Sequence, residues 1–582
     1  MKIASKSLAN LARPARSPRQ LAEEERSPAE STLSPTAAAV LAAIPAWWRT
    51  RASEAGLDGE WLDIQFALDA KPPFVLSEVP SLEHEWGHLP PEAVGAAYVE
   101  SLDREVRAQN GRYYTPALLS DHLWQMTRSS LGMPRDLAPA PGLIRDPACG
   151  AGSLLLPALR EHLDASLDVD PQLVLNRLPS LFEGIDLDPA AVWVANVVLA
   201  SQMLSTLVRV PIARRRQLPA LARVGDGLDA NLAAARAIIM NPPYLRVALD
   251  QIERERFASS LYGHANLYGL FLASATEQLQ DDGVLSAIVP TSFTSGRYFE
   301  PLRRLLTSKT RLREISFTAS RSAFFGSVLQ ETCLASFTVR RVRKTRVSLI
   351  NTDLTPIASV KSPIGGEPWI LPRQRELAPI AAAVARFPLT LKSAGWRVST
   401  GPLVWNRRKE DLHARSGIER YPIIWAADID GGKLHRDRAR ASVRYIALQK
   451  ESDRKVLLLS TPCLLVQRTT APEQQKRLVS ARLSEEALAG LGGSVVIENH
   501  VNVVRPSTDS PLISLRLLEK LFEMQAFDKV IRCMSGSVAI SAYELESLPL
   551  PAKDVLTQWS GLSDEELRLA VSQVYSGSEA TP

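Results

Sequence analysis

Short apolar segments alternate with amphipathic stretches between about residues 92 and 345 of this chain. The apolar segments run into acidic, glycine-rich or proline-rich turns, and helical patterns follow them, as expected of strand–turn–helix units. The segments read LIRDPACGAGS, LFEGIDLD, ARVGDGL, AIIMNPPY and VLSAIVPTSF. This repetition predicts an α/β fold built on a doubly wound, mainly parallel sheet.

The flanking sequence divides the chain into further parts. A Ser-, Pro- and Arg-rich stretch with few large apolar residues opens the chain, and a proline-rich junction follows the α/β region. Beyond that junction the pattern becomes irregular, with short strands and turns, which favours a mixed α+β domain. The expected parts are a disordered tail (1–36), a helical extension (37–91), the α/β domain (92–350), a linker (351–372) and the second domain (373–575).

Composition narrows the class of protein. Of 582 residues, 45% are apolar and 23% charged, which excludes a wholly disordered or fibrous chain. No 18 consecutive residues are apolar, and the first 20 residues contain no apolar run, so we expect neither a membrane span nor secretion. The four cysteines form no CxxC pair, which favours a reducing cytoplasm over a disulfide framework or zinc site.

Positive charge is concentrated late in the chain. Residues 391–480 hold 18 Lys and Arg but 9 Asp and Glu, a net charge of +9 against +5 for the whole protein. Such a window is typical of a polyanion-binding face, and a solvated basic surface without a partner is the alternative.

Three acidic turns follow predicted strands at intervals of about 40 residues. Asp146 opens the turn DPACGAGS, in which Gly150 lets the backbone approach a ligand at the start of a helix. Asp186 ends the second strand, where a carboxylate can accept hydrogen bonds from ribose hydroxyls. Asp226 lies in the third turn, GDG. Carboxyl ends of parallel strands share one edge, so these three side chains are expected to line one crevice.

A fourth turn, Asn241-Pro242-Pro243-Tyr244, follows the buried strand AIIM. Two consecutive prolines stop the strand and stiffen the turn. The Asn241 amide oxygen and the Pro242 carbonyl are then two fixed acceptors for an exocyclic amino group, and the Tyr244 ring can stack on the planar ring that carries it. An ordinary Pro-Pro loop is the alternative.

These motifs resemble a known family. DPACGAGS, GIDLDPAAV and NPPY, in this order, resemble S-adenosylmethionine-dependent amino-methyltransferases, and GRYYTP ahead of them resembles the opening motif of gamma-type, Eco57I-like DNA adenine-N6 methyltransferases. The resemblance covers residues 92–345. Later segments, LLVQRTTAPEQQKRL and IENHVNVVRP, are similar to target-recognition domains of Eco57I-like enzymes.

The resemblance implies S-adenosylmethionine as cofactor and a role for each matching residue. Tyr114, Thr115 and Pro116 would line the methionine end, Asp146 and Gly150 the amino-acid moiety, Asp186 the ribose and Asp226 the adenine amino group, while Asn241, Pro242 and Tyr244 would hold the target base. Phe325, with Phe324 as the alternative, would stack on the other face of that base, unless both are plain core residues.

The implied activity is site-specific methylation of N6 of a flipped-out adenine in double-stranded DNA, as the modification part of a restriction–modification system with a separate restriction endonuclease as partner. Because the NPPY motif would bind an NH2 group whatever molecule carries it, methylation of RNA, of protein glutamine and of cytosine N4 are alternatives. The cytosine-N4 enzymes usually carry Ser in place of Asn241. A non-catalytic nucleic-acid-binding protein with a retired cofactor fold is a further alternative.

The second domain would carry target recognition. Arg407, Arg408 and Lys409 follow Trp405 as a basic cluster, and Arg436, Arg438 and Arg440 alternate, so that on a strand they would share one face. All six are predicted DNA contacts.

No metal is expected. Residues 84–88 match the HExxH pattern of zinc proteases, but Gly87 lies inside the pattern and Pro90-Pro91 follows it, so a stable helix presenting both histidines is not expected. Pro462-Cys463 resembles the nucleophile of cytosine-C5 methylases, yet it lies in an apolar run typical of a buried structural cysteine.

Overall fold

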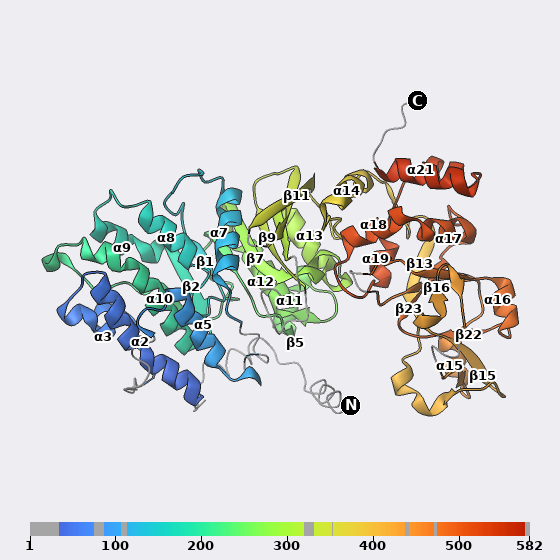
Figure 1. The fold of residues 1–582 in the computed structure, drawn as a ribbon, viewed down its shortest axis with the longest axis horizontal. Coiled ribbons are helices and arrows are strands. Elements are labelled where there is room, and N and C mark those ends of the chain that lie inside the picture. Colours follow the sequence, from blue (N-terminus) through green and yellow to red (C-terminus); the bar gives the residue numbers. More distant parts are fainter. Residues whose placement is uncertain are drawn as a thin grey trace. The chain divides into compact units, whose positions relative to one another are not determined.

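The computed structural model describes residues 34–74, 86–105, 107, 113–318, 331–351, 353–436, 442–470 and 474–576 (Figure 1). The chain forms two compact units. The first contains Met1–Phe293, Pro301–Thr355 and Ile364–Gly366, and the second contains Thr294–Glu300, Pro356–Pro363 and Glu367–Pro582. How these units correspond to functional domains stays a prediction.

A nine-stranded sheet of order β11-β10-β8-β9-β7-β4-β1-β2-β3 forms the framework of the first unit. Its strands are β1 (Ile144–Asp146), β2 (Phe182–Asp186), β3 (Ala222–Val224), β4 (Ala235–Met240), β7 (Leu279–Pro290), β8 (Arg311–Thr318), β9 (Thr332–Thr338), β10 (Lys344–Ile350) and β11 (Leu354–Lys361). Strands β3, β2, β1, β4 and β7 run parallel, as the sequence predicted. The sheet as a whole is mixed, because β9 lies antiparallel between β7 and β8.

The strand order reverses at β1. Ile144 pairs with Phe182 of β2 on one side and with Ala237 of β4 on the other. The connections leaving β1 and β4 therefore diverge, which opens a crevice at the carboxyl ends of these strands.

Helices cover this sheet and carry most of the apolar core. They are α2 (Pro35–Glu54), α3 (Ile64–Ala67), α5 (Pro91–Ser101), α7 (Ala117–Leu131), α8 (Leu156–Asp164), α9 (Pro171–Leu181), α10 (Pro189–Val208), α11 (Gln251–Arg256), α12 (Leu267–Glu277) and α13 (Glu300–Lys309), and a short hairpin, β5 (Arg246–Val247) with β6 (Ala265–Asn266), precedes α12. Helix α7 packs on β4, β7, β8 and β9, and α12 packs on β7. Helices α2 and α5 pack on α10, and all three contribute to one buried cluster with β1, β2 and β4.

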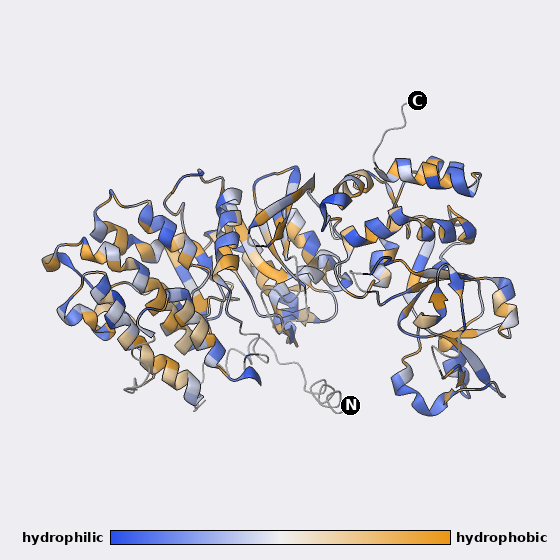
Figure 2. Cartoon of the chain, viewed as in Figure 1, coloured by the Kyte–Doolittle hydropathy of each residue, from blue (hydrophilic) through white to orange (hydrophobic). Residues whose placement is uncertain are grey.

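The longest apolar helix is α10, drawn mostly in the hydrophobic colours in Figure 2. By length and composition alone this helix could cross a membrane, although the sequence predicted no membrane span. However, 83% of its most apolar window is buried inside the protein, which is the environment of a core helix.

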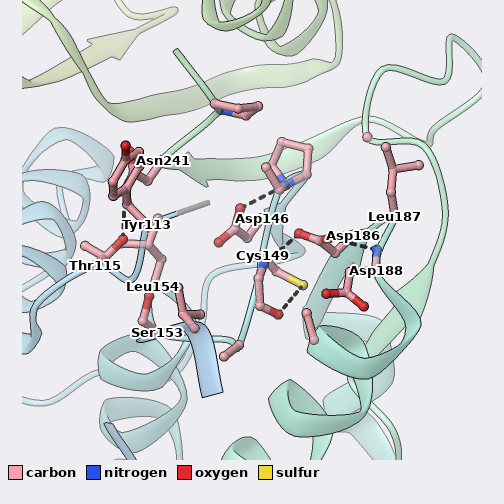
Figure 3. Close-up of a pocket in the computed structure, with 18 of the residues that line it drawn as sticks. Tyr113, Thr115, Asp146, Cys149, Ser153, Leu154, Asp186, Leu187, Asp188 and Asn241 are labelled. Carbon is pink, nitrogen blue, oxygen red and sulfur yellow. Dashed lines mark hydrogen bonds between the residues drawn. The ribbon is translucent and has the colours of Figure 1, made fainter. Parts of the chain in front are cut away.

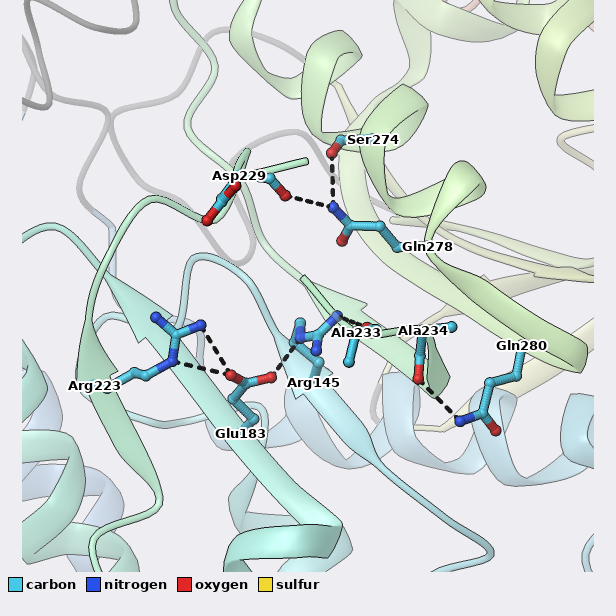
Figure 4. Close-up of polar contacts among 9 residues, drawn as sticks. All are labelled: Arg145, Glu183, Arg223, Asp229, Ala233, Ala234, Ser274, Gln278 and Gln280. Carbon is cyan, nitrogen blue, oxygen red and sulfur yellow. Dashed lines mark hydrogen bonds and ion pairs between the residues drawn. The ribbon is translucent and has the colours of Figure 1, made fainter. Parts of the chain in front are cut away.

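The connection between β3 and β4 contains no helix among its described residues, and side chains hold it instead (Figure 4). Gln278 donates to the Asp229 carbonyl at 2.8 Å, Arg145 to the Ala233 carbonyl at 2.6 Å, and Gln280 to the Ala234 carbonyl at 2.9 Å. The connection contains Asp226, so these bonds hold the segment that continues from the predicted cofactor turn.

Glu183 is the centre of a cross-strand ion-pair ladder that includes Arg145 (Figure 4). The Arg145 Nε lies 2.6 Å from Glu183 of β2, and Glu183 also pairs with Arg223 of β3 at 3.0 Å. The Arg145 side chain is 2% exposed, whereas the Arg223 side chain is 49% exposed. Two arginines thus share one carboxylate in very different surroundings.

The second unit combines small sheets with helices, as the expected α+β pattern implies. Its strands form a four-stranded sheet (β13-β23-β20-β21), a five-stranded sheet (β14-β18-β15-β22-β19) and two pairs, β12-β24 and β16-β17. The strand bounds are β12 (Leu389–Thr390), β13 (Trp396–Thr400), β14 (Leu412–His413), β15 (Arg420–Ile424), β16 (Ile429–Asp430), β17 (Lys433–Leu434), β18 (Tyr445–Ala447), β19 (Leu458–Leu459), β20 (Cys463–Gln467), β21 (Ser480–Leu483), β22 (Val495–Ile497), β23 (Val501–Pro506) and β24 (Pro549–Leu550). The helices are α14 (Ala378–Val384), α15 (Glu451–Leu457), α16 (Glu485–Gly490), α17 (Leu515–Glu523), α18 (Gln525–Met534), α19 (Ala542–Glu546), α20 (Lys553–Trp559) and α21 (Asp564–Ser576).

Replacement of Arg145 by Met should destabilise the first unit by about 3 kcal/mol, because it leaves Glu183 and the Ala233 carbonyl without their buried donor. Arg223→Met removes an exposed partner of the same carboxylate and should cost less than about 1 kcal/mol. Urea unfolding, with hydrogen exchange of peptides covering β1 and β2, measures both. Equal losses would show that burial of Arg145 is not what gives this ladder its strength.

Candidate functional site

A pocket opens at the carboxyl ends of β1, β2, β3 and β4, within the first unit. Asn241 and Thr115 lie at one end, Asp186 and Asp188 at the other, and Asp146 lies between them (Figure 3). The pocket therefore lies at the reversal of strand order, where the sequence placed it.

The turn after β1 is shaped by backbone conformation and by carboxylates. Gly150 and Gly152 have φ angles of 49° and 83°, in the left-handed region that favours glycine. Asp186 accepts hydrogen bonds from the backbone N–H of Gly150 at 2.8 Å and of Asp188 at 3.0 Å. Asp146 accepts from the N–H of Ala148 at 3.1 Å. Two of the predicted cofactor carboxylates thus also hold the turns in place.

Asp146 has an unusual ionisation. Burial raises the pKa of its carboxyl to about 8, the Ala148 N–H opposes the rise, and the neighbouring Asp186 adds to it. Burial likewise raises the pKa of the Cys149 thiol, so this cysteine is a packed neutral group.

The turn after β3 packs directly against the turn after β1. A Cβ atom on Gly227 would lie 1.8 Å from the Pro147 carbonyl oxygen, so glycine is required at this position by close approach. Its neighbour Asp226 lines the pocket and accepts from the N–H of Leu228 at 2.8 Å. Phe271 of α12 adds an aromatic wall beside this turn.

The Asn241 carboxamide is held from two sides. Its Nδ2 donates to Thr115 Oγ1 at 3.0 Å, and its Oδ1 accepts from the Tyr244 hydroxyl at 2.9 Å. The same hydroxyl lies 3.1 Å from the Ile288 carbonyl. The Tyr244 ring meets Tyr268 edge-on, with centroids 6.0 Å apart, and burial raises the Tyr244 pKa well above its usual value.

Most of the predicted site residues come together. Those that line the pocket are Tyr114, Thr115, Asp146, Gly150, Asp186, Asp226 and Asn241. Pro116 is the N-cap of α7, and Pro242 and Tyr244 follow Asn241 in the turn after β4. Phe325 and its alternative Phe324 lie outside the described residues.

Sequence reasoning missed several residues of the pocket wall. The Tyr98 hydroxyl of α5 donates to Asp188 at 2.8 Å, and Asp188 in turn caps α10 at Ala190. The Asp188-Pro189 pair is a helix-start signal that could have marked this carboxylate. The Tyr114 hydroxyl is buried in the wall and has no hydrogen-bond partner within the described part of the chain.

The predicted DNA-contacting residues of the second unit differ in their exposure and in their ion pairs. Arg407 and Lys409 are exposed. Arg408 pairs with Asp411 and with Asp453, so its charge is locally balanced. Arg436 donates to the Arg444 carbonyl at 2.9 Å and lies over the Tyr445 ring, 5.5 Å from its centroid, in a segment with no strand assignment. The predicted strand face with Arg438 and Arg440 falls outside the described residues.

No group of three or more His, Cys, Asp or Glu side chains suited to a metal ion occurs among the described residues. Of the HExxH pattern, His84 and Glu85 lie outside that part of the chain, and His88 lies 3.0 Å from Glu54.

The chain is similar in sequence and fold to several known proteins. Residues 236–325 match the family model described as Eco57I restriction-modification methylase. The Type II methyltransferase M.PstI of Providencia stuartii is 27% identical over 338 residues, and M.BsuBI of Bacillus subtilis is 25% identical over 332 residues. Each alignment covers 55% of this chain, which spans 65% of the relative's length.

Among solved structures, the Type IIL restriction-modification enzyme MmeI, determined in complex with DNA, has a TM-score of 0.54 at 13% identity, over 93% of this chain and 88% of that one. At this identity the likeness concerns the fold. The family model and the two curated relatives agree with one another: the chain is similar to Eco57I-type restriction-modification methylases over the matched residues.

Proposed function

We propose that this protein is a site-specific DNA methyltransferase that transfers a methyl group to N6 of a flipped-out adenine, as the modification part of a restriction–modification system. The observation that carries the proposal is the position of Asn241 at one end of a pocket lined by three strand-end carboxylates. An amide oxygen there is a hydrogen-bond acceptor, which suits an exocyclic amino group. The relatives' names as Type II methyltransferases support the reaction class.

The pocket fits S-adenosylmethionine, which when bound supplies an electrophilic methyl group. We assign Asp186 to the ribose and Asp226 to the adenine amino group, with Asp146 and Gly150 at the amino-acid moiety. Two features support the fit: the buried Tyr114 hydroxyl faces no protein partner among the described residues, and Phe271 offers an aromatic surface for a nucleobase. Thr115 and Pro116 complete the methionine end.

The residues after β4 then act on the target base. The Asn241 Oδ1 atom and the Pro242 carbonyl accept hydrogen bonds from the amino group of the base. These bonds turn the lone pair of its nitrogen toward the proposed S-adenosylmethionine pocket. Tyr244 stacks on the base, and Phe325 is proposed for the opposite face. Stacking contributes about 1–3 kcal/mol per base and offsets part of the cost of flipping. Holding the reactants in line supplies most of the remaining acceleration, and no metal is required.

The second unit is proposed to bind double-stranded DNA and to select the sequence. Exposed Arg407 and Lys409 are the best placed of the predicted cluster for phosphate contacts, because neighbouring Arg408 is engaged by two carboxylates. The family implies a separate restriction endonuclease as partner, and we expect both proteins in the cytoplasm.

Purified protein incubated with methyl-labelled S-adenosylmethionine and mixed DNA should yield N6-methyladenine at one sequence context. Asn241→Ala should lower transfer at least about 100-fold, since it removes a fixed acceptor for the amino group, while calorimetric cofactor affinity changes by no more than a few-fold. Exposed Asn231→Ala is the matched control. Label in cytosine N4, RNA or protein glutamine would identify one of the alternative acceptors, and loss of cofactor affinity in Asn241→Ala would overturn the site assignment.

Cofactor binding should release protons near neutral pH. Asp146, with its pKa raised to about 8, is protonated below that pH in the empty pocket, whereas a cationic amino-acid moiety favours the carboxylate. Affinity should therefore fall as pH decreases below about 8, by up to about tenfold per pH unit. Calorimetry at pH 7 in buffers of different ionisation enthalpy measures the release, and Asp146→Asn should abolish it. An unchanged pH slope in Asp146→Asn would assign the effect to another group.

The double variant Arg407→Ala/Lys409→Ala should reduce the slope of log affinity against log salt for DNA by about two and weaken binding to all sequences alike. Arg408→Ala, between the two, should change the slope by less than about half a unit because its charge is already neutralised. Fluorescence anisotropy over a salt series measures both. Wild-type slopes in the double variant would rule out this cluster as a phosphate contact.

A further inference from the structure

The Asn241 carboxamide has two ends of nearly equal size and opposite hydrogen-bonding character. Its oxygen accepts, and its NH2 group donates. A rotation by 180° about the last side-chain bond would present a donor to a target amino group, which is itself a donor. The proposed function, on which this inference rests, therefore needs something that fixes the carboxamide in one orientation.

Thr115 is placed to do this. Its side chain is 3% exposed, and its hydroxyl oxygen accepts from Asn241 Nδ2 at 3.0 Å across 126 positions of sequence. The residue is held by its position directly before Pro116, whose carbonyl accepts the first backbone bonds of α7 from Leu119 and Ser120. A rigid helix start thus holds the acceptor for the NH2 end of the carboxamide.

The Tyr244 hydroxyl contacts the oxygen end of the Asn241 carboxamide and has a single proton to donate. The hydroxyl lies 2.9 Å from Asn241 Oδ1 and 3.1 Å from the Ile288 carbonyl, but one O–H donates fully to one acceptor at a time. Ile288 directly follows Ala287, which pairs with Met240, the last residue of β4. The Ile288 carbonyl is therefore an alternative acceptor within reach, at the end of the β4–β7 ladder.

We propose that Thr115 and Tyr244 are positioning residues for Asn241. Thr115 fixes which side of the carboxamide carries the oxygen. The Tyr244 hydroxyl satisfies that oxygen in the empty site and turns to the Ile288 carbonyl when an amino group arrives. The oxygen is thereby never left without a donor, and a base without an amino group gains nothing by displacing the hydroxyl.

The first test separates this role from contact with the cofactor. Thr115→Val keeps the shape but removes the hydroxyl, so the transfer rate at saturating cofactor and acceptor should fall about 10- to 100-fold, with cofactor affinity within about threefold. Thr115→Ser restores the hydroxyl and should recover at least a third of the rate. Thr127→Val makes the same change on α7, where the hydroxyl donates to the Leu123 carbonyl, and should leave the rate unchanged.

The second test asks whether both hydroxyls act through one group. Tyr244→Phe should lower the same rate about 3- to 10-fold, because the ring is kept and the donor is lost. In the double variant with Thr115→Val the loss should be clearly smaller than the product of the single losses, since both changes free the same carboxamide.

Rates are measured on the acceptor that the assay with methyl-labelled S-adenosylmethionine identifies. A protein or RNA acceptor would overturn the proposed DNA substrate, and the Thr115 and Tyr244 variants would then be tested on that acceptor. Neutron crystal structures of deuterated Thr115→Val and Thr115→Ser, in which the deuterated amide NH2 group is distinguished from the oxygen, report the orientation of the Asn241 carboxamide independently of turnover. An unchanged saturated rate with weakened cofactor binding in Thr115→Val, multiplicative losses in the double variant, or an Asn241 orientation unchanged in Thr115→Val would each overturn the proposal.

Discussion

The hydrogen bond from the Gly150 backbone N–H to Asp186 joins the turn after β1 to the turn after β2, and the pocket depends on it. It places a carboxylate from one strand end against the left-handed backbone of the neighbouring turn. The arrangement also brings Asp186 close to buried Asp146, and two carboxylates in a low-dielectric site repel one another. The rise in the pKa of Asp146 follows from this burial and proximity, so the geometry that shapes the pocket also sets its ionisation.

The N-terminal helices also shape the pocket. Tyr98, Val99 and Leu102 of the α5 region line the pocket, and the Tyr98 hydroxyl bonds to Asp188 beyond the end of β2. Helix α2 packs on both α5 and α10. Before residue 92, helix α2 over Pro35–Glu54 packs in the core of the first unit. Part of the pocket wall is thus built from a segment that carries none of the recognised motifs.

Local signals explain what the sequence could predict. The strands ending at Asp146, Asp186 and Met240 are short apolar runs closed by turn-forming residues, and each lies where it was expected. Helix α9 and strands β8, β9 and β10 were not singled out, because their apolar positions are few or interrupted by Arg, Ser and Thr, and pairing across the sheet decides their state. Likewise, charge counts cannot tell exposed Arg407 from Arg408, which is paired with Asp453, a residue brought near by folding. The bond of Asn241 to Thr115, 126 positions away in the sequence, also depends on tertiary structure.

The β3–β4 connection has a thermodynamic consequence. A helix at this place would cover the sheet with apolar side chains, and its release would expose hydrophobic surface with a large increase in heat capacity. Here donors from Gln278, Arg145 and Gln280 to backbone carbonyls hold the segment instead. Exposure of polar groups lowers the heat capacity. The free energy of local opening at this edge of the pocket should therefore vary almost linearly with temperature, while that of the α10 core follows a strongly curved profile.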